Sequence, residues 1–109
     1  MNMSSKLIEA VKAKKTIEVR RIISVGCDLE SSDDRNMTAL LHACEVQSFD
    51  ILKALVDAGG NVNHKDDLGY KPVDIAHWYG EFRMGAYTTE SQRMVKYLEK
   101  HGGKSSFNK

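Results

Sequence analysis

The chain has 109 residues, which is the size of one small domain and leaves no room for separate catalytic and regulatory domains. Its 16 Lys and Arg against 15 Asp and Glu give a formal net charge of +1, which argues against a protein that coats nucleic acid or an anionic membrane. No apolar run reaches the roughly 18 residues of a membrane span. Residues 1–15 lack a signal-peptide pattern, so we expect a cytoplasmic location.

The sequence matches itself at an offset of 33 residues. Ala10, Ala43 and Ala76 are separated by this interval, and so are Gly26 and Gly59. Each unit has the pattern of a short helix, a tight turn, a second helix that ends at a glycine, and a polar stretch. We therefore expect a single domain over residues 1–109, with repeats at about 5–33, 34–66 and 67–103 and a tail at 104–109, which frays from Ser105 onward.

The second repeat shows the pattern without a gap. Thr38 is expected to cap its first helix, Asp50 to open its second helix, and Gly59 to supply the left-handed residue after that helix. The inward positions are apolar at helical spacing: Leu40, Leu41, Ala43 and Cys44 in the first helix, and Ile51, Leu52, Leu55 and Val56 in the second.

The polar linkers carry turn signals. Residues 66–69 predict a turn with Gly69 at a position of positive φ, and Asn36 takes the equivalent place 33 residues earlier because asparagine tolerates that conformation. Pro72 is expected at the first position of the third repeat's first helix.

This pattern resembles the ankyrin repeats over roughly residues 5 to 103. Their 33-residue unit opens with T-P-L-H-x-A; residues 38–43 have Ala for Pro and Leu for His, and residues 71–76 keep the Pro and the final Ala. The resemblance implies an all-α solenoid of about three helix-turn-helix units joined by short β-turn or hairpin connections. It also implies a concave surface of turn tips and first helices that binds another protein.

The third repeat departs from the period. From Gly59 to Gly102 is 43 residues, ten more than expected, and the register places the insertion at about 81–91. A tolerated surface loop and a functional loop both remain open. Trp78 likewise fits either a core residue that covers the last repeat or an exposed anchor for a partner.

The residues with reactive side chains do not form a catalytic or metal pattern. Cys27 and Cys44 fit no zinc spacing and occupy repeat positions of small residues, so we expect reduced, packed thiols. The histidines His42, His64, His77 and His101 have no carboxylate at ligand spacing. A Cys44 nucleophile with His42 or His77 as base lacks any sign of an oxyanion hole. We expect neither an enzyme, nor a metal, nor a cofactor.

Charge is distributed unevenly along the chain. Residues 1–30 carry six Lys or Arg against four acids, which is typical of a solvated end-cap face rather than a nucleic-acid site. Residues 31–66 carry six acids against three bases, and several of these acids lie at predicted turn tips. A basic partner would be steered toward them.

These observations predict a non-catalytic protein-interaction module. The partner-binding residues expected from the register lie at the turn tips (Asp34, Arg35, Met37, Asp67, Leu68, Tyr70), on the inner helix face (His42, Glu45, Trp78, Tyr79) and in the insertion (Phe82, Tyr87). The alternative is an inhibitor or immunity-type protein that neutralises one enzyme or toxin. We expect a monomer that binds neither nucleic acid nor membranes, with a homodimer through the aromatic-rich last repeat as the second possibility.

Overall fold

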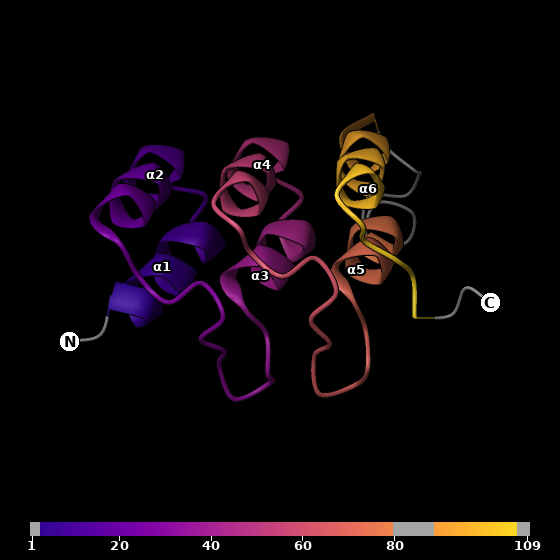
Figure 1. Ribbon diagram of the computed structural model, residues 1–109, viewed down its shortest axis with the longest axis horizontal. Helices are drawn as coiled ribbons and strands as arrows, with labels where there is room; N and C mark the ends of the chain where they lie inside the picture. Colours follow the sequence, from indigo (N-terminus) through magenta and orange to yellow (C-terminus); the bar gives the residue numbers. More distant parts are fainter. Residues whose placement is uncertain (1–2, 80–88, 107–109) are drawn as a thin grey trace.

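The computed structural model describes residues 3–79 and 89–106, in which six α-helices and no β-strand are present. The helices are α1 (Met3–Lys12), α2 (Thr16–Val25), α3 (Ala39–Glu45), α4 (Phe49–Asp57), α5 (Pro72–Trp78) and α6 (Thr89–Lys100). Helices α1, α3 and α5 form one row, the inner helices, and α2, α4 and α6 form a second row above it, the outer row. Two long hairpins, with turns at residues 33–37 (first hairpin) and 66–70 (second hairpin), project below the inner helices (Figure 1). The predicted all-α solenoid of three helix-turn-helix units is confirmed.

The helix ends follow local chemistry. The Thr38 hydroxyl accepts a hydrogen bond from the Leu41 N–H, as expected for the cap of α3, and Pro72 is the first residue of α5. The prediction that Asp50 opens α4 is wrong by two residues. The cap is Ser48, whose hydroxyl accepts from the Ile51 N–H, and Asp50 lies in the first turn.

The hairpins turn where the sequence predicts left-handed residues. Asn36 has φ +57° and Gly69 has φ +86°, each near the end of a tight turn. In the first hairpin the Asp33 N–H donates to the carbonyl of Met37, and in the second the Asp66 N–H donates to the carbonyl of Tyr70. Because the same bond recurs 33 residues later, the two hairpins share one geometry.

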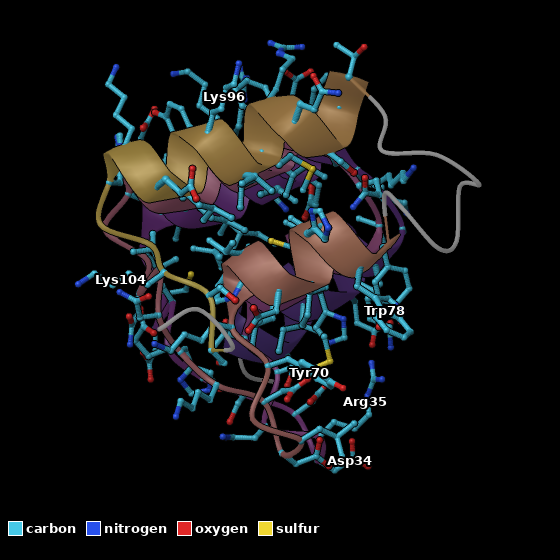
Figure 2. All side chains as sticks on the ribbon, turned by 90° about the vertical axis from the view of Figure 1, so that its right-hand side faces the viewer. Asp34, Arg35, Tyr70, Trp78, Lys96 and Lys104 are labelled. Carbon is cyan, nitrogen blue, oxygen red and sulfur yellow. The ribbon has the colours of Figure 1, made fainter. Side chains whose placement is uncertain are left out.

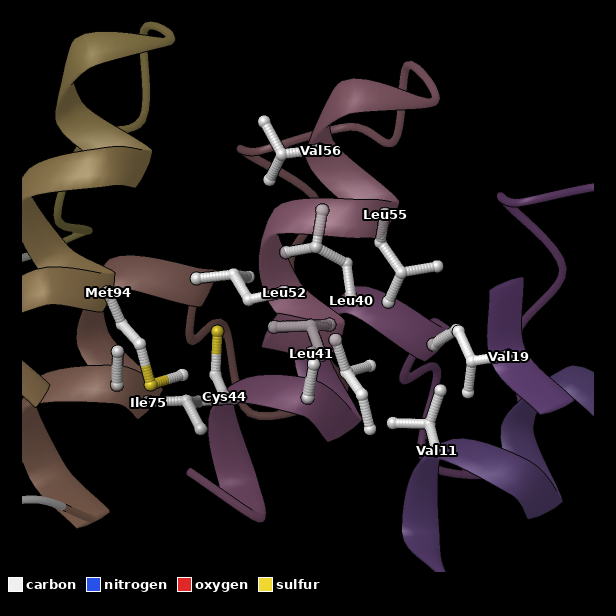
Figure 3. Packing of buried hydrophobic residues seen from close by; sticks show 14 of the residues in the cluster. Val11, Val19, Leu40, Leu41, Cys44, Leu52, Leu55, Val56, Ile75 and Met94 are labelled. Carbon is white, nitrogen blue, oxygen red and sulfur yellow. The ribbon is translucent and has the colours of Figure 1, made fainter. Parts of the chain in front are cut away.

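The core runs continuously through the stack. The inward residues predicted for the second repeat are all buried: Leu40, Leu41, Ala43, Cys44, Ile51, Leu52, Leu55 and Val56. Within the cluster, Leu52 points toward the side of Ile75 and Met94, and Leu55 points toward Val19 (Figure 3). The middle repeat thus buries apolar surface against both neighbours, which is how a solenoid gains stability.

The third repeat has a longer second helix than the repeat before it. Helix α6 has 12 residues, whereas α4 has nine. The last three residues of the predicted insertion, 89–91, are therefore helical and not loop; residues 80–88, with Phe82 and Tyr87, lie outside the described part. This first turn contacts the second repeat, because a Glu90 carboxylate oxygen accepts from the Phe49 N–H at 2.8 Å.

The start of the tail is ordered by hydrogen bonds, against the prediction that it frays. The Ser105 hydroxyl donates to the Asp74 carboxylate at 2.6 Å, and the Ser106 N–H donates to the same group. The Ser106 hydroxyl donates to the Gly69 carbonyl. Asp74 is 9% exposed, and a buried carboxylate requires such donors, which the sequence pattern alone did not reveal.

Truncation of Leu52 tests the shared core. Its side chain is fully buried, so Leu52→Ala leaves a cavity between repeats and should lower the free energy of unfolding by about 2–5 kcal/mol. Urea denaturation followed by far-UV circular dichroism measures the change. The control Lys96→Ala alters an exposed position of α6 and should stay within about 0.5 kcal/mol of the parent chain. Equal changes in unfolding free energy for Leu52→Ala and Lys96→Ala would contradict the packing of Leu52 between the repeats.

Substitution of Gly59 tests its backbone role. Gly59 has φ +100°, and a Cβ added there would meet no atom within 4 Å, so any cost comes from the backbone conformation alone. Gly59→Ala should therefore lower the unfolding free energy by about 1–2 kcal/mol. Gly59→Asn should cost less, because asparagine adopts the left-handed conformation more readily. Thermal melts of both variants measure the difference, and an asparagine variant less stable than the alanine variant would refute this explanation.

Candidate functional site

A groove of about 690 Å³ lies beside α5 and the second hairpin. Its lining residues come from both hairpins, the inner helices, α6 and the start of the tail: Arg35, Met37, Glu45, Asp66, Leu68, Tyr70, Val73, Asp74, Ile75, His77, Trp78, Tyr79, Val95, Glu99 and Ser105. Arg35, Tyr70 and Trp78 follow one side of the molecule, whereas Lys96 lies on the outer helix row and Lys104 on the opposite side (Figure 2).

Two aspartates shape the hairpins that border this groove. Asp33 Oδ1 accepts from the N–H groups of Arg35 and Met37, and Asp66 Oδ1 accepts from those of Leu68 and Tyr70. Each carboxylate thereby satisfies two backbone donors of its own turn. Both tips keep a defined shape as a result.

Hydrogen bonds also join the two hairpins to each other. The Asp67 N–H donates to the carbonyl of Arg35, and the Asn36 side-chain amide donates to the carbonyl of Lys65, both at 3.0 Å. The His64 ring lies 2.9 Å from the Asn36 carbonyl oxygen. These bonds hold the tip residues at a set separation, which pre-organises the surface between them.

Glu45 links the groove to the inner helices. Its Oε2 accepts from the Tyr79 hydroxyl at 3.0 Å and lies 3.5 Å from the Arg35 guanidinium. Glu45 and Trp78 occupy equivalent positions of α3 and α5, because they are 33 residues apart. The contact between Glu45 and Tyr79 therefore ties neighbouring repeats together at the groove wall.

Behind this wall, His42 is buried between two carboxylates. Its Nε2 lies 2.7 Å from Asp33 Oδ2, and its Nδ1 lies 3.5 Å from Glu45 Oε1 without a hydrogen-bond partner. Partial burial acts to raise the pKa of the Asp33 carboxyl. The hydrogen bonds from His42 and from the N–H groups of Met37 and Arg35 outweigh that effect and hold the pKa below its ordinary value.

Most residues expected to bind a partner do line the groove, namely Arg35, Met37, Glu45, Leu68, Tyr70, Trp78 and Tyr79. Asp34 and Asp67 are exposed at the hairpin tips. Two expectations need correction. His42 is fully buried under Asp33, and Met37 is only 2% exposed because it packs into the core, so neither offers a free surface to a partner.

Trp78 is an exposed residue, so it is not a core residue that covers the last repeat, and its role as an anchor for a partner stays a prediction. It is 51% exposed at the end of α5, and Leu68 is 76% exposed on the second hairpin. Tyr97 of α6, by contrast, is partly buried and packs edge-to-face on Phe49 of α4, with ring centroids 5.6 Å apart. Large apolar side chains exposed beside a groove are typical of binding surfaces.

Several lining residues escaped the sequence prediction. Asp66 and its equivalent Asp33 were recognised only as acidic turn residues, although their 33-residue spacing could have marked them as a matched pair. Val95, Glu99 and Ser105 reach the groove from α6 and the tail. No local pattern could have placed them there, because their position depends on how the third repeat folds back.

The described residues offer little for covalent chemistry. Cys44 is completely buried, and burial raises the pKa of its thiol far above the ordinary value; partial burial also raises the pKa of Cys27. Neither thiol is therefore primed as a nucleophile. Within residues 3–79 and 89–106, no three His, Cys, Asp or Glu side chains come together as metal ligands would.

Among the helices of residues 3–79 and 89–106, none has both the length and the apolar character needed to cross a bilayer.

The contact between Asp33 and His42 predicts a pH-dependent contribution to stability. Asp33→Asn keeps an oxygen for the turn but removes the charge facing His42, and should lower the unfolding free energy at pH 7 by about 1–2 kcal/mol. Because the folded-state pKa of Asp33 is lowered, its contribution is present above the ordinary value near 4 and is lost as the pH falls through the folded value. The difference between parent and variant should therefore shrink between about pH 5 and pH 2.

Urea denaturation over this pH series measures the difference, within the range where both chains fold. Asp34→Asn at the exposed neighbouring position is the matched control and should show little effect at pH 7. A difference between Asp33→Asn and the parent chain that does not change with pH would contradict the assignment.

The comparisons agree with this architecture. The family model for ankyrin repeats matches residues 7–108 in three copies. No curated protein matches the chain closely enough to count as a relative. Because the family model covers nearly all of the three helix pairs and both hairpins, the chain belongs to the ankyrin repeat family.

Proposed function

We propose that this chain is a non-catalytic interaction module whose groove and hairpin tips bind another protein. The observation that carries the proposal is the exposure of Leu68 and Trp78 on one groove of a rigid scaffold. Ankyrin repeats are in general protein-interaction modules, and the proposal places that role on particular side chains of this chain. A cytoplasmic location and a monomeric state that binds neither nucleic acid nor membranes belong to the same proposal.

The chemistry of the groove supports this function. Its walls combine apolar and aromatic side chains with a few charged groups, such as Glu45 and Arg35. Such a mixture suits a protein ligand, since apolar burial supplies affinity and polar groups set orientation. Aromatic anchors such as Trp78 often dominate the binding energy of protein interfaces.

The rigidity of the surface also supports binding. The hydrogen bonds between the hairpins, from Asp67 to Arg35 and from Asn36 to Lys65, fix the tips before any partner arrives. A pre-organised surface loses little conformational freedom on association. Affinity can then come from a modest contact area.

The inhibitor or immunity-type alternative rests on small size and on the acidic hairpins. An inhibitor would bind one enzyme or toxin at its active site, whereas a general module would bind a non-catalytic segment. Purification of the partner distinguishes the two, because an inhibitor should return a single catalytic protein whose activity it abolishes.

The test compares baits that differ only in the groove. The parent chain, the double variant Leu68→Ser/Trp78→Ala and the outer-row control Lys96→Ala are used to capture proteins from cells of the source organism, with quantification by mass spectrometry. Loss of one anchor residue at an interface costs about 2 kcal/mol or more, so the double variant should bind the partner at least about 30-fold more weakly. Lys96→Ala should bind like the parent.

The proposal fails if the double variant retains the partner and the outer-row variant loses it. Circular dichroism melts of all three chains show whether a loss of binding reflects unfolding. Sedimentation velocity of the parent chain reports separately whether the last repeat forms a homodimer.

A further inference from the structure

We infer that the groove recognises a basic peptide segment of its partner, in which an apolar side chain is flanked by Arg or Lys. The inference rests on the proposed function and specifies the partner's chemistry. Its basis is that acidic side chains and exposed apolar side chains line the same groove.

The charge of the hairpins differs from that of the whole chain. The chain carries a formal net charge of +1. Residues 28–37 and 61–70, which form the hairpins and their approaches, nevertheless contain six acids and only two Lys or Arg: Asp28, Glu30, Asp33, Asp34, Asp66 and Asp67 against Arg35 and Lys65. The hairpins and their approaches are therefore more negative than the chain as a whole, and Asp66 of the second hairpin lines the groove.

The groove lining repeats this imbalance. Four lining residues are acids, namely Glu45, Asp66, Asp74 and Glu99, and among the described lining residues Arg35 is the only Lys or Arg. An acidic, partly enclosed surface attracts cations and repels anionic segments, and this sets both the rate of association and the choice of partner. Asp66 and Asp74 already accept hydrogen bonds from the chain, and their negative charge still favours a basic segment over an acidic one.

Arg35 shows which group suits the wall of the groove. Its guanidinium lies 3.5 Å from Glu45 Oε2 while its side chain remains 52% exposed, so the contact is loose and open to solvent. Guanidinium groups pair with carboxylates and stack on aromatic rings, and Tyr79 donates to the same Glu45 oxygen. An arginine of the partner would meet the same combination of carboxylate and aromatic side chain.

The need for an apolar side chain in the peptide follows from the part of the groove that the second hairpin and α5 form. Leu68 is 76% exposed and Trp78 is 51% exposed, and the buried residues Val73 and Ile75 of α5 also line the groove. A volume of about 690 Å³ lies within the range of sites that enclose bulky side chains. A segment with only charged residues would leave this wall in contact with water, so at least one aromatic or branched aliphatic residue is needed.

Selection from a random peptide library tests the composition directly. Phage-displayed peptides of about 12 residues are selected on the immobilised parent chain, after removal of phage that bind Leu68→Ser/Trp78→Ala. The enriched peptides should combine net positive charge with an aromatic or branched aliphatic residue. The strongest peptide is then synthesised with a fluorophore, and its affinity is measured by anisotropy.

The charge contribution is tested with isosteric variants. In Asp66→Asn/Asp67→Asn/Glu99→Gln, the Asn at position 66 keeps the oxygen that accepts from Leu68 and Tyr70, so the hairpin should retain its shape. This variant should bind the peptide about tenfold more weakly at about 50 mM NaCl, and the loss should largely vanish at about 500 mM. Lys96→Glu on the outer row is the control and should change the affinity little.

The outcomes separate the two proposals. Neutral or acidic peptides that depend on Trp78 would overturn the basic-segment inference and leave the proposed function intact. If no selected peptide depends on Leu68 and Trp78, both fail. Concentration-dependent self-association that the charge variant abolishes would show that the basic first repeat of a second copy occupies the groove, and this also overturns the inference.

Discussion

No helix pair of this chain can bury its apolar face alone, and the rest of the structure follows from that constraint. Leu52 is completely buried although it belongs to a helix of only nine residues, because α4 packs between α2 and α6. Short helices of this kind are marginal in isolation, so their stability comes from neighbouring repeats. The stack in turn supplies a fixed spacing, and this spacing brings Glu45 of one repeat next to Tyr79 of the next. The groove is thus a product of the same packing that forms the core.

The hairpins are polar segments outside the core, and hydrogen bonds rather than apolar packing keep them rigid. Asp33 and Asp66 accept hydrogen bonds from the backbone of their own turns, and bonds between the two hairpins connect their tips. The acids that give the hairpins their negative charge therefore also determine their shape. Recognition and local structure depend on the same carboxylates, which explains why the charge can be concentrated here without loss of order.

The features that sequence analysis predicted correctly are those decided by local chemistry. Asn36 and Gly69 are marked by their tolerance of positive φ, Pro72 by its fixed φ, and the apolar positions by their helical spacing. The features it missed depend on contacts between distant segments. The burial of His42 requires Asp33 from the preceding hairpin, and Ser105 is ordered because the Asp74 carboxylate accepts a hydrogen bond from its hydroxyl. About half of the groove lining could be predicted because it follows the repeat register, whereas the contributions of α6 and the tail could not.

The same hydrogen bond joins the linkers that follow successive repeats, although the second and third repeats differ in length. Glu30 accepts from the Asn61 N–H, and Asn63, its equivalent, accepts from the Lys104 N–H. The ten extra residues of the third repeat lie upstream of this bond and do not disturb it. The path of the chain at a repeat boundary therefore stays the same even where the repeats on its two sides differ in length and surface.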